Sequence, residues 1–278
     1  MVDQIVLTAL DGTLLNSSEV GAPEERSNEN SDDRYEQLRS LLEQLREKGI
    51  PVILFSRRDR TEIDSIRQQL GLVDPFIAES GSAVFTPVDH NPFEPSLGEK
   101  EDNYFVLTLG CPYVQARAGL RVLANIISHP LKGFGDFTVP QLQKLAGISE
   151  QAAHQAKARE FSELFMTPKA VDSAELQQAA EDMGFEVVLR SKEETRFSEL
   201  LGSGASLATA ASAVVEAYLT QLEPGKSLSV TVISSRSDNL AALSQVKSDL
   251  DIATWREVLT DAPAPDGWLN AVAPLLGT

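Results

Sequence analysis

The sequence predicts an α/β fold in which a mainly parallel sheet is interrupted by a second domain. Apolar runs at 5–9 and 51–56 alternate with helical patterns, as in consecutive βα units with right-handed crossovers. From about residue 86 the texture changes to a Pro- and acid-rich connector and an α+β block, and βα alternation returns after about residue 195. With 278 residues and 42% hydrophobic content, the chain can bury a large core in about two domains.

The first βα unit follows from residue type and spacing. The run at 5–9 is a strand, and Asp32 or Asp33 can cap the helix after it. Leucines at helical spacing place one apolar face on that helix, namely Leu38, Leu41, Leu42 and Leu45. Gly49 ends the helix, because glycine readily adopts the left-handed conformation that closes helices.

The second and third strands are marked by their composition. PVILFS at 51–56 is continuously apolar, as expected for a strand of a parallel sheet that is covered on both faces. A helix near 60–70 follows and stops at Gly71. A third apolar stretch, PFIAES at 75–80, precedes Gly81 and a short strand, SAVF.

The middle of the chain has a different pattern from its ends. Strands are expected at 104–110 and 185–190, with several helical segments between them. The parallel-sheet pattern then resumes with an alanine-rich helix at about 208–222 and the strand LSVTVIS at 228–234. A last helix of this unit starts near Asp238.

These patterns predict a core at 1–85 and 196–278 with an inserted α+β cap at 86–195. Within the core, a flexible acidic loop is expected at 17–34. The stretch 17–36 holds seven acids and two bases without an aliphatic run, so it cannot repay the entropy of ordering. Such a loop is either a docking tail or a tolerated surface insertion.

Composition excludes several classes of protein. A net charge of −17 argues against binding to nucleic acid or to an anionic membrane, because both need clustered Lys and Arg. The sequence contains no apolar run of 18 residues and no signal-peptide pattern near its start, so we expect no membrane insertion and a cytoplasmic location. The single Cys111 is expected to be a packing residue, and the three histidines lack the spacing of metal ligands.

The most informative motif is IVLTALDGTLL at 5–15. A strand followed by Asp-Gly is by itself an ordinary turn signal. The stretch also resembles the first motif of the haloacid dehalogenase (HAD) phosphatases, a strand ending in Asp-x-Asp-Gly-Thr-Leu. In that family the first Asp is the nucleophile and the second is the general acid/base. The resemblance places the acid/base at Asp11 but an alanine, Ala9, at the nucleophile position.

Four longer segments narrow the resemblance. They are KGFGDFT (132–138), AKAREFSELF (156–165), TRFSELLGSG (195–204) and TDAPAPDGWLNAV (260–272). In this order they resemble segments of the mannosyl-3-phosphoglycerate phosphatases. The resemblance implies a Rossmann-like HAD core with an inserted α+β cap of the Cof type. It also implies magnesium-dependent hydrolysis of a phosphorylated sugar glycerate.

Other catalytic positions carried over from the family are also changed. The hydroxyl that steadies the phosphate matches Ser56, but the phosphate-neutralising lysine falls on Ser206 or Leu207. Two magnesium-binding carboxylates fall on Ser235 and Asn239. Magnesium prefers hard oxygen ligands and needs carboxylates to repay its dehydration, so we expect no metal site and no cofactor.

The sequence therefore predicts a catalytically inactive pseudophosphatase that acts as a binding, regulatory or scaffold protein. An alanine methyl cannot attack phosphorus, and deleting a nucleophile costs about 10⁶-fold in rate where it has been measured. The alternative is a magnesium-dependent mannosyl-3-phosphoglycerate phosphatase, which the resemblance along the chain supports. A third class of function is a structural subunit of a larger assembly, which no feature of the sequence indicates directly.

Ligand contacts can be proposed in both domains. In the core, the turn of Asp11, Gly12 and Thr13 offers backbone N–H groups that, together with Ser56, could hold an anion. Arg58 lies just beyond and is either a ligand contact or part of a solvated helix entrance. In the cap, the resemblance suggests sugar or glycerate contacts at Asp136, Arg159, Glu160 and Ser162, and we expect REFSE on a helix. The expected partners are a protein of unknown identity and a phosphorylated sugar, with no nucleic acid.

Overall fold

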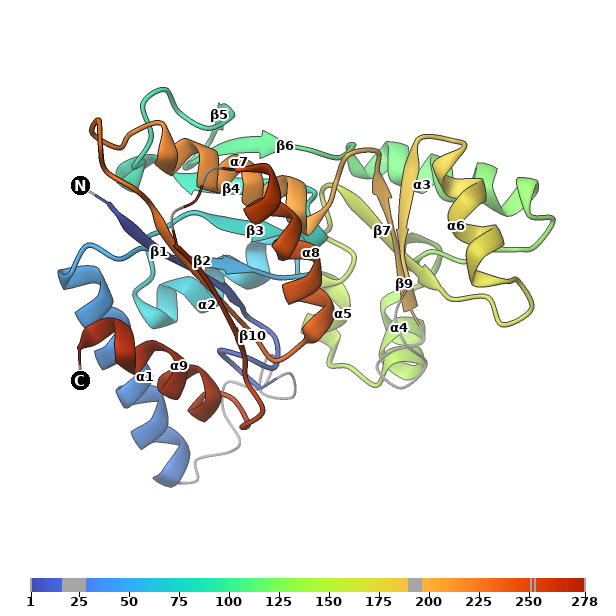
Figure 1. Ribbon diagram of the computed structural model, residues 1–278. Helices are drawn as coiled ribbons and strands as arrows, with labels where there is room; N and C mark the ends of the chain where they lie inside the picture. Colours follow the sequence, from blue (N-terminus) through green and yellow to red (C-terminus); the bar gives the residue numbers. More distant parts are fainter. Residues whose placement is uncertain (1, 17–28, 190–196, 251, 253, 278) are drawn as a thin grey trace.

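The computed structural model describes residues 2–16, 29–189, 197–250, 252 and 254–277, which form two lobes (Figure 1). In these residues the larger lobe holds an eight-stranded sheet of order β11-β10-β1-β2-β3-β4-β6-β5. The smaller lobe holds a three-stranded sheet of order β7-β9-β8. The expected α/β core with an inserted α+β cap is therefore present.

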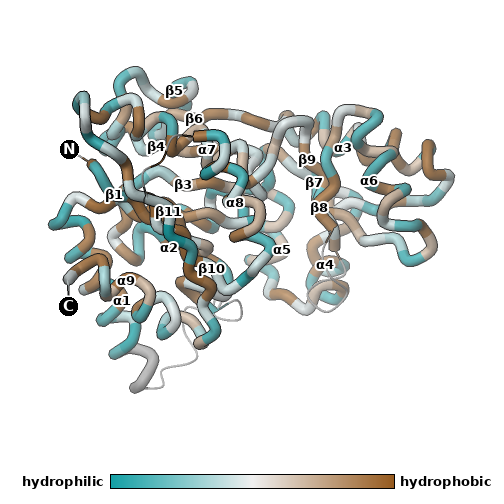
Figure 2. The backbone as a smooth tube through the Cα atoms, in the orientation of Figure 1, coloured by the Kyte–Doolittle hydropathy of each residue, from teal (hydrophilic) through white to brown (hydrophobic). Residues whose placement is uncertain are grey.

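The core sheet has a parallel part and an antiparallel edge. The five strands from β11 to β3 pair in parallel, whereas β4, β6 and β5 add antiparallel strands at one edge. The strands are β1 (Gln4–Ala9), β2 (Val52–Phe55), β3 (Phe76–Ala78), β4 (Ala83–Pro87), β5 (Glu99–Glu101), β6 (Tyr104–Thr108), β10 (Ser229–Ser234) and β11 (Thr254–Leu259). The central strands are buried on both faces, which is why they read as continuous apolar runs, and β10 is largely brown in Figure 2.

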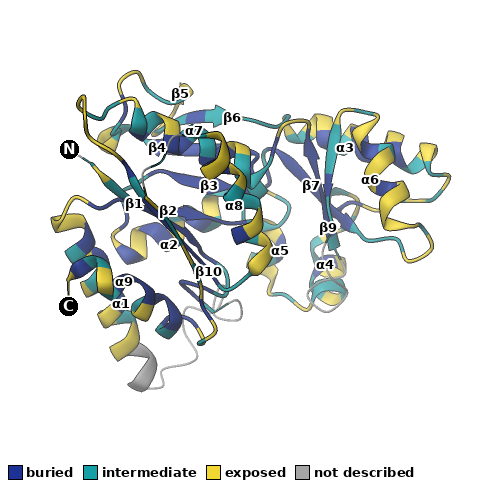
Figure 3. Cartoon of the chain, viewed as in Figure 1, coloured by how far each residue is buried: buried dark blue, intermediate teal, exposed yellow. Residues whose placement is uncertain are grey.

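Helices cover both faces of this sheet, so the core has three layers (Figures 1 and 3). One face packs against α1 (Glu29–Glu47), α2 (Arg60–Leu70) and α9 (Asp266–Leu276), and the other against α7 (Leu207–Leu219) and α8 (Ser237–Asp249). The second helix shows why these elements form: Asp59 caps it by accepting from the Glu62 N–H. Gly71 ends it at φ 69°, as the sequence predicted.

The cap helices form two groups, one of which lies on the side of the cap sheet that faces away from the core (Figure 1). The elements of the cap are α3 (Tyr113–Ile126), α4 (Val139–Ala146), α5 (Glu150–Gln155), β7 (Ser162–Met166), α6 (Ser173–Glu181), β8 (Phe185–Val188) and β9 (Phe197–Gly202). Leu120 and Leu123 of α3 pack against Phe165 and Leu200 of the cap sheet. The described part of the chain also contains three 3₁₀ turns: η1 (Glu79–Gly81), η2 (Val88–His90) and η3 (Phe134–Asp136). Among the described residues, no helix has the length and apolar character needed to cross a bilayer.

The domain boundaries differ from those expected at residues 86 and 195. Strands β5 and β6 belong to the core sheet, since β6 pairs antiparallel with β4. Strand β9 pairs with β7 and β8 in the cap sheet. The Pro- and acid-rich connector is thus a loop within the core. The change of amino-acid composition near residue 86 does not mark the place where the chain enters the cap.

Three local expectations also need correction. Helix α1 begins at Glu29, so Asp32 and Asp33 lie inside it rather than at its start. The expected flexible loop at 17–34 is therefore helical from 29 onward, and residues 17–28 lie outside the described part. REFSE does not lie on a helix, because Ser162 begins strand β7, which pairs antiparallel with β9.

The chain crosses between the lobes twice, after β6 and after β9, and the two crossing segments touch. A Cβ added to Gly202 would lie 2.4 Å from the Cys111 backbone nitrogen and 2.7 Å from the Gly110 carbonyl carbon. Only glycine at position 202 allows the two backbones to approach this closely. Cys111 itself is a free thiol whose pKa is raised by burial.

Candidate functional site

The carboxyl ends of three neighbouring strands define the candidate site. Strand β1 pairs with β10 on one side and with β2 on the other, all in parallel, so the loops that follow them meet at one edge of the sheet. In open α/β sheets this edge is where ligands bind. The loops bring together the core positions that the sequence singled out.

Asp11 lies in the turn after β1, and both of its carboxylate oxygens have protein partners. The Ser56 hydroxyl donates to Asp11 Oδ2 at 2.7 Å, and Arg58 Nε donates to Oδ1 at 2.7 Å. Gly12 holds the turn with φ 71° and donates its N–H to the Leu15 carbonyl. The carboxylate is thus held by a hydroxyl and a guanidinium at the end of the sheet.

Arg58 is anchored by two acids. Besides Asp11, it forms an ion pair with Glu62 in the first turn of α2. Burial alone would lower the pKa of the Arg58 guanidinium, but the two carboxylates outweigh it and raise that pKa above its ordinary value. Burial also raises the pKa of Glu62, with Arg58 opposing the shift. Arg58 is therefore a fixed cation beside Asp11, with 16% of its side chain exposed.

A reciprocal pair of contacts links the β1 and β10 loops. The Thr13 hydroxyl donates to Ser235 Oγ at 3.1 Å, and the Ser235 backbone N–H donates to Thr13 Oγ1 at 2.8 Å. Asn239 donates its Nδ2 to Ser234 Oγ at 3.1 Å. Ser235 and Asn239, two of the predicted site positions, thus contact neighbouring hydroxyls.

Asp238, which precedes Asn239 in the sequence, is held by arginines. Asp238 accepts from Arg236 Nε at 2.9 Å, and Arg57 approaches it at 3.9 Å. The hydrogen bond from Arg236 is the main reason that the pKa of Asp238 lies below its ordinary value, and the nearby Arg57 adds to the effect. Among the described residues, no group of three or more His, Cys, Asp or Glu side chains is arranged to hold a metal ion.

The position expected for the phosphate-neutralising lysine lies at the start of α7. Leu207 is the first residue of this helix, and Ser206 caps it by accepting from the Thr209 N–H at 3.0 Å. The helix start packs on the loop after β3, where a Cβ on Gly81 would lie 2.2 Å from the Ser206 carbonyl oxygen. Both sequence alternatives thus place an uncharged side chain here.

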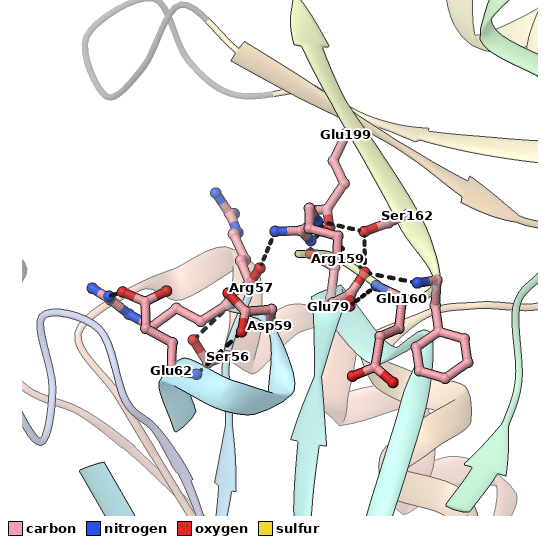
Figure 4. A network of polar contacts seen from close by, with 12 residues as sticks. Ser56, Arg57, Asp59, Glu62, Glu79, Arg159, Glu160, Ser162 and Glu199 are labelled. Atoms are coloured by element: carbon pink, nitrogen blue, oxygen red, sulfur yellow. Dashed lines mark hydrogen bonds and ion pairs between the residues drawn. The ribbon is translucent and has the colours of Figure 1, made fainter. Parts of the chain in front are cut away.

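A second polar cluster joins the core to the cap (Figure 4). Glu79 follows β3, Glu199 lies on β9 and Arg159 precedes β7, and their side chains are 1%, 0% and 5% exposed. Arg159 forms an ion pair with Glu199 and approaches Glu79 Oε2 at 3.5 Å. We call these three residues, with Ser162, the interlobe cluster.

The interlobe cluster is densely hydrogen-bonded. Arg159 Nε donates to Ser162 Oγ at 2.8 Å, and its terminal nitrogen donates to the Arg57 carbonyl oxygen at 3.0 Å. Glu79 accepts backbone N–H bonds from Glu160 at 2.8 Å and from Phe161 at 3.1 Å. Burial would lower the pKa of Arg159, but the two glutamates hold it above its ordinary value. Through Arg57, the cluster touches the loop that carries Ser56 and Arg58.

The predicted cap contacts fall into separate environments. Arg159 and Ser162 are buried in the interlobe cluster, whereas the Glu160 carboxylate pairs with Arg60 at 2.9 Å. Asp136 lies elsewhere in the cap and accepts from Arg117 at 2.8 Å and from the Gly133 N–H at 3.1 Å. Among the described residues, the partners of Asp136 all lie in the cap, so these four residues do not form one constellation.

Sequence reasoning did not identify Glu79 or Glu199 as functional positions. Glu79 ends the apolar run PFIAES, and Glu199 interrupts the apolar run of SELL. An acid within a strand that is otherwise buried needs a partner, because an unpaired buried charge is costly. That signal could have indicated a buried cation, but it could not have named Arg159.

Comparison with known proteins agrees with this geometry. A family model described as haloacid dehalogenase-like hydrolase matches residues 6–102. A glucosyl-3-phosphoglycerate/mannosyl-3-phosphoglycerate phosphatase of Persephonella marina is 30% identical over 200 residues, which cover 72% of this chain and 67% of that protein. The chain belongs to the haloacid dehalogenase-like hydrolases. Within them, it is related to the glucosyl- and mannosyl-3-phosphoglycerate phosphatases.

Other matches support the same placement. A mannosyl-3-phosphoglycerate phosphatase of Pyrococcus horikoshii is 34% identical over 44% of this chain and 49% of its own length. The Thermoplasma acidophilum protein 0175 has the same fold at TM-score 0.59 and 14% identity, covering 100% of this chain and 99% of its own. A haloacid dehalogenase-like hydrolase of Bacillus subtilis aligns at TM-score 0.55 and 16% identity, covering 98% of each chain. These structures establish the fold.

Proposed function

We propose that this chain is a catalytically inactive relative of the sugar-phosphoglycerate phosphatases that acts by binding. One observation carries the proposal: β1 ends in the methyl of Ala9, while the neighbouring Asp11 carboxylate is engaged by Ser56 and Arg58. A phosphatase of this family type needs a nucleophile at the first of these positions. A methyl group has no lone pair with which to attack phosphorus.

The residues at the sheet edge do not suit magnesium. The ion requires near-octahedral oxygen ligands and usually takes one or two carboxylates from the protein. Here Asp11 is already paired with a guanidinium, and Ser235 is hydrogen-bonded to Thr13. Asn239 is a neutral amide, and Asp238 is paired with Arg236. We therefore propose that the protein works without magnesium or another cofactor.

The changes at the four catalytic positions have one effect in common: each places a neutral side chain where the family has a charged one. A lysine at position 207 would face a site from which the carboxylates at 9, 235 and 239 are absent. Removing one side of a buried charge arrangement leaves the other uncompensated at a cost of about 3–5 kcal/mol. Replacing all of them together with neutral side chains avoids that cost. This pattern favours loss of hydrolysis over a single chance substitution.

A phosphate-release assay tests the proposal. Purified protein with magnesium should release no phosphate from mannosyl- or glucosyl-3-phosphoglycerate. The matched variant restores the four positions together, as Ala9→Asp, Leu207→Lys, Ser235→Asp and Asn239→Asp, after circular dichroism has shown that it folds. Turnover by the unmodified chain that scales with its concentration would contradict the proposal. Turnover by the restored variant alone would identify these positions as the cause.

Phosphatase activity is the second candidate, because the relative from Persephonella marina carries that name and is 30% identical over 72% of this chain. The same assay decides between the two. For the binding function we propose two kinds of partner, a protein and a phosphorylated sugar. The turn of Gly12 and Thr13 with Ser56 and Arg58 offers donors for an anion, but Asp11 already neutralises the guanidinium. This favours a protein partner.

A further inference from the structure

The turn that follows β3 has a strained backbone. Glu79 and Ser80 of η1 are not glycines, yet both lie in the left-handed region, at φ 47° and φ 59°. A residue with a Cβ rarely adopts this conformation, which persists only where surrounding contacts hold it in place. Backbone strain of this kind is found at ligand clamps and switch regions. We therefore expect the side chains of both residues to make contacts that offset the strain.

The Glu79 carboxylate bonds to the cap segment that leads into β7. Its Oε1 accepts from the Glu160 N–H at 2.8 Å, and its Oε2 accepts from the Phe161 N–H at 3.1 Å. The Ser162 hydroxyl donates to the same Oε2 at 2.5 Å (Figure 4). One carboxylate of the core therefore binds three consecutive residues of the cap.

A second set of contacts joins strand β9 to the same turn. The Ser80 hydroxyl donates to Glu199 Oε2 at 2.6 Å. Glu199 also pairs with Arg159, which donates across the junction to the Arg57 carbonyl oxygen at 3.0 Å. The two strained residues of the core thus reach two different segments of the cap, residues 160–162 and β9.

An aromatic side chain of the cap also packs into the core. Phe161 precedes β7 in the chain, but it belongs to the apolar cluster of the larger lobe, with its ring centroid 6.2 Å from that of Phe85. The backbone N–H of the same residue donates to Glu79, so polar and apolar contacts across the junction lie side by side. Moving the cap away would expose the ring to water and break this hydrogen bond together.

We infer that the interlobe cluster, with Ser80 and Phe161, is a latch that holds the cap on the core, so that the two lobes move as one body in the native protein. Parting the lobes breaks all of these contacts at once, and hydrogen bonds to ionised groups are stronger than neutral ones. The strained turn is retained because its side chains supply the contacts that close the latch. This differs from a cap that opens and closes on each turnover. The latch does not rest on the proposed function, since it concerns the junction whether or not the chain hydrolyses phosphate esters.

Native-state hydrogen exchange followed by NMR tests the latch. The amides of Glu160 and Phe161 report on it, because their acceptor, Glu79, belongs to the other lobe. The reference is the Val6 amide of β1, which donates to the Pro51 carbonyl oxygen within the core. In the wild type, the protection of the two junction amides should lie within about tenfold of that of Val6, because the junction opens only when most of the structure does. Weaker protection than this would show that the lobes part on their own and would overturn the inference.

A variant of the strained turn shows whether the junction can open separately from the core. Glu79→Gln keeps the size of the side chain but removes the charge that accepts the two cap N–H groups, so the junction amides should lose about tenfold or more in protection relative to Val6. The control is Arg60→Gln, which removes a partly exposed pair with Glu160 across the same junction and should change their protection less than about threefold. Circular dichroism checks that each variant folds. An equal loss at the junction and at Val6, or no loss at all, would overturn the inference.

Ser80→Ala is a second and milder variant. It removes only the hydroxyl that bonds to Glu199. Protection of the junction amides should fall relative to Val6, in the same direction as in Glu79→Gln but by less, because one neutral donor is lost and the Glu79 carboxylate remains. If Glu79→Gln does not fold, unchanged protection in Ser80→Ala would overturn the inference in its place.

Discussion

The two polar regions described above, the sheet edge and the interlobe cluster, contain the same types of charged residue but differ in how far those residues are buried. At the sheet edge, the side chains of Asp11 and Arg58 are 33% and 16% exposed. If one of them is removed, water can solvate the charge of the other and so replace part of the lost ion pair. In the interlobe cluster, Glu79, Arg159 and Glu199 are 5% exposed or less and depend on one another. The charges at the sheet edge are thus the more exposed ones, while those of the interlobe cluster are almost fully buried.

The difference shows what each region contributes. Removing one member of a buried ion cluster leaves an uncompensated charge, whereas exposed pairs contribute little on average. We therefore expect the interlobe cluster to fix how the cap sits on the core, and the sheet edge to tolerate substitution. The following predictions test this comparison, from the largest effect to the smallest.

Arg159→Met should destabilise the protein most. It leaves Glu79 and Glu199 buried without their shared cation, and we expect a loss of about 3–5 kcal/mol in the free energy of unfolding. Urea denaturation followed by circular dichroism measures it. The control is Arg46→Met, which removes an exposed pair with Glu43 and should cost far less, because water screens that pair. Equal losses for the two variants would remove the contrast between the regions.

Arg58→Ala should have an intermediate effect. It removes the guanidinium shared by Asp11 and Glu62, and hydrogen bonds to charged groups contribute about 1.5–3 kcal/mol when shielded. Because Asp11 is one-third exposed, solvent screening reduces the expected loss to about 1–2 kcal/mol. The same denaturation assay measures it. A loss as large as that of Arg159→Met would mean that the edge is as tightly organised as the cluster.

Ser56→Ala should cost about 0.5–1.5 kcal/mol, the usual net contribution of one hydrogen bond. The variant also tests what the edge binds. A thermal-shift screen of phosphorylated sugars and glycerates, run on both proteins, should show no stabilisation if the chain serves as a scaffold. Reproducible stabilisation by one compound, lost in Ser56→Ala, would show that the edge still recognises an anion.

Asp238→Asn should have the smallest effect, about 0.2–1 kcal/mol, because the pair with Arg236 is exposed. The pKa of Asp238 is lowered from 3.8, chiefly by the Arg236 hydrogen bond, so the unfolded chain takes up this proton first as pH falls. The contribution of Asp238 is therefore present above about pH 3.8 and lost below it. Melting temperatures recorded between pH 5 and 2 should fall less steeply in the variant. An unchanged slope would contradict the assignment.

The strands and helices of the core could be predicted because their signals are local. Continuous apolar runs marked β1, β2 and β10, and Gly71 ended α2 as its position suggested. The resemblance to the HAD phosphatases placed Asp11 and Ser56 in one site, and their hydrogen bond brings them together. The inferences about strands and helices need only periodicity and the hand of the βα unit.

Long-range contacts set the features that were missed. Strand β9 pairs in the cap sheet although it lies beyond the expected cap boundary, and nothing in its own residues indicates its partner. REFSE has spacing compatible with a helix, but Ser162 begins a strand because β9 offers an edge to pair with. Arg159 could not be matched with Glu79, because they are 80 positions apart and meet only after both lobes form.

The contact at Gly202 joins the two segments that cross between the lobes. With the Cys111 nitrogen only 2.4 Å from where a Cβ would stand, neither segment can shift sideways without displacing the other. A side chain at position 202 would therefore push the two crossing segments apart at the place where the core meets the cap.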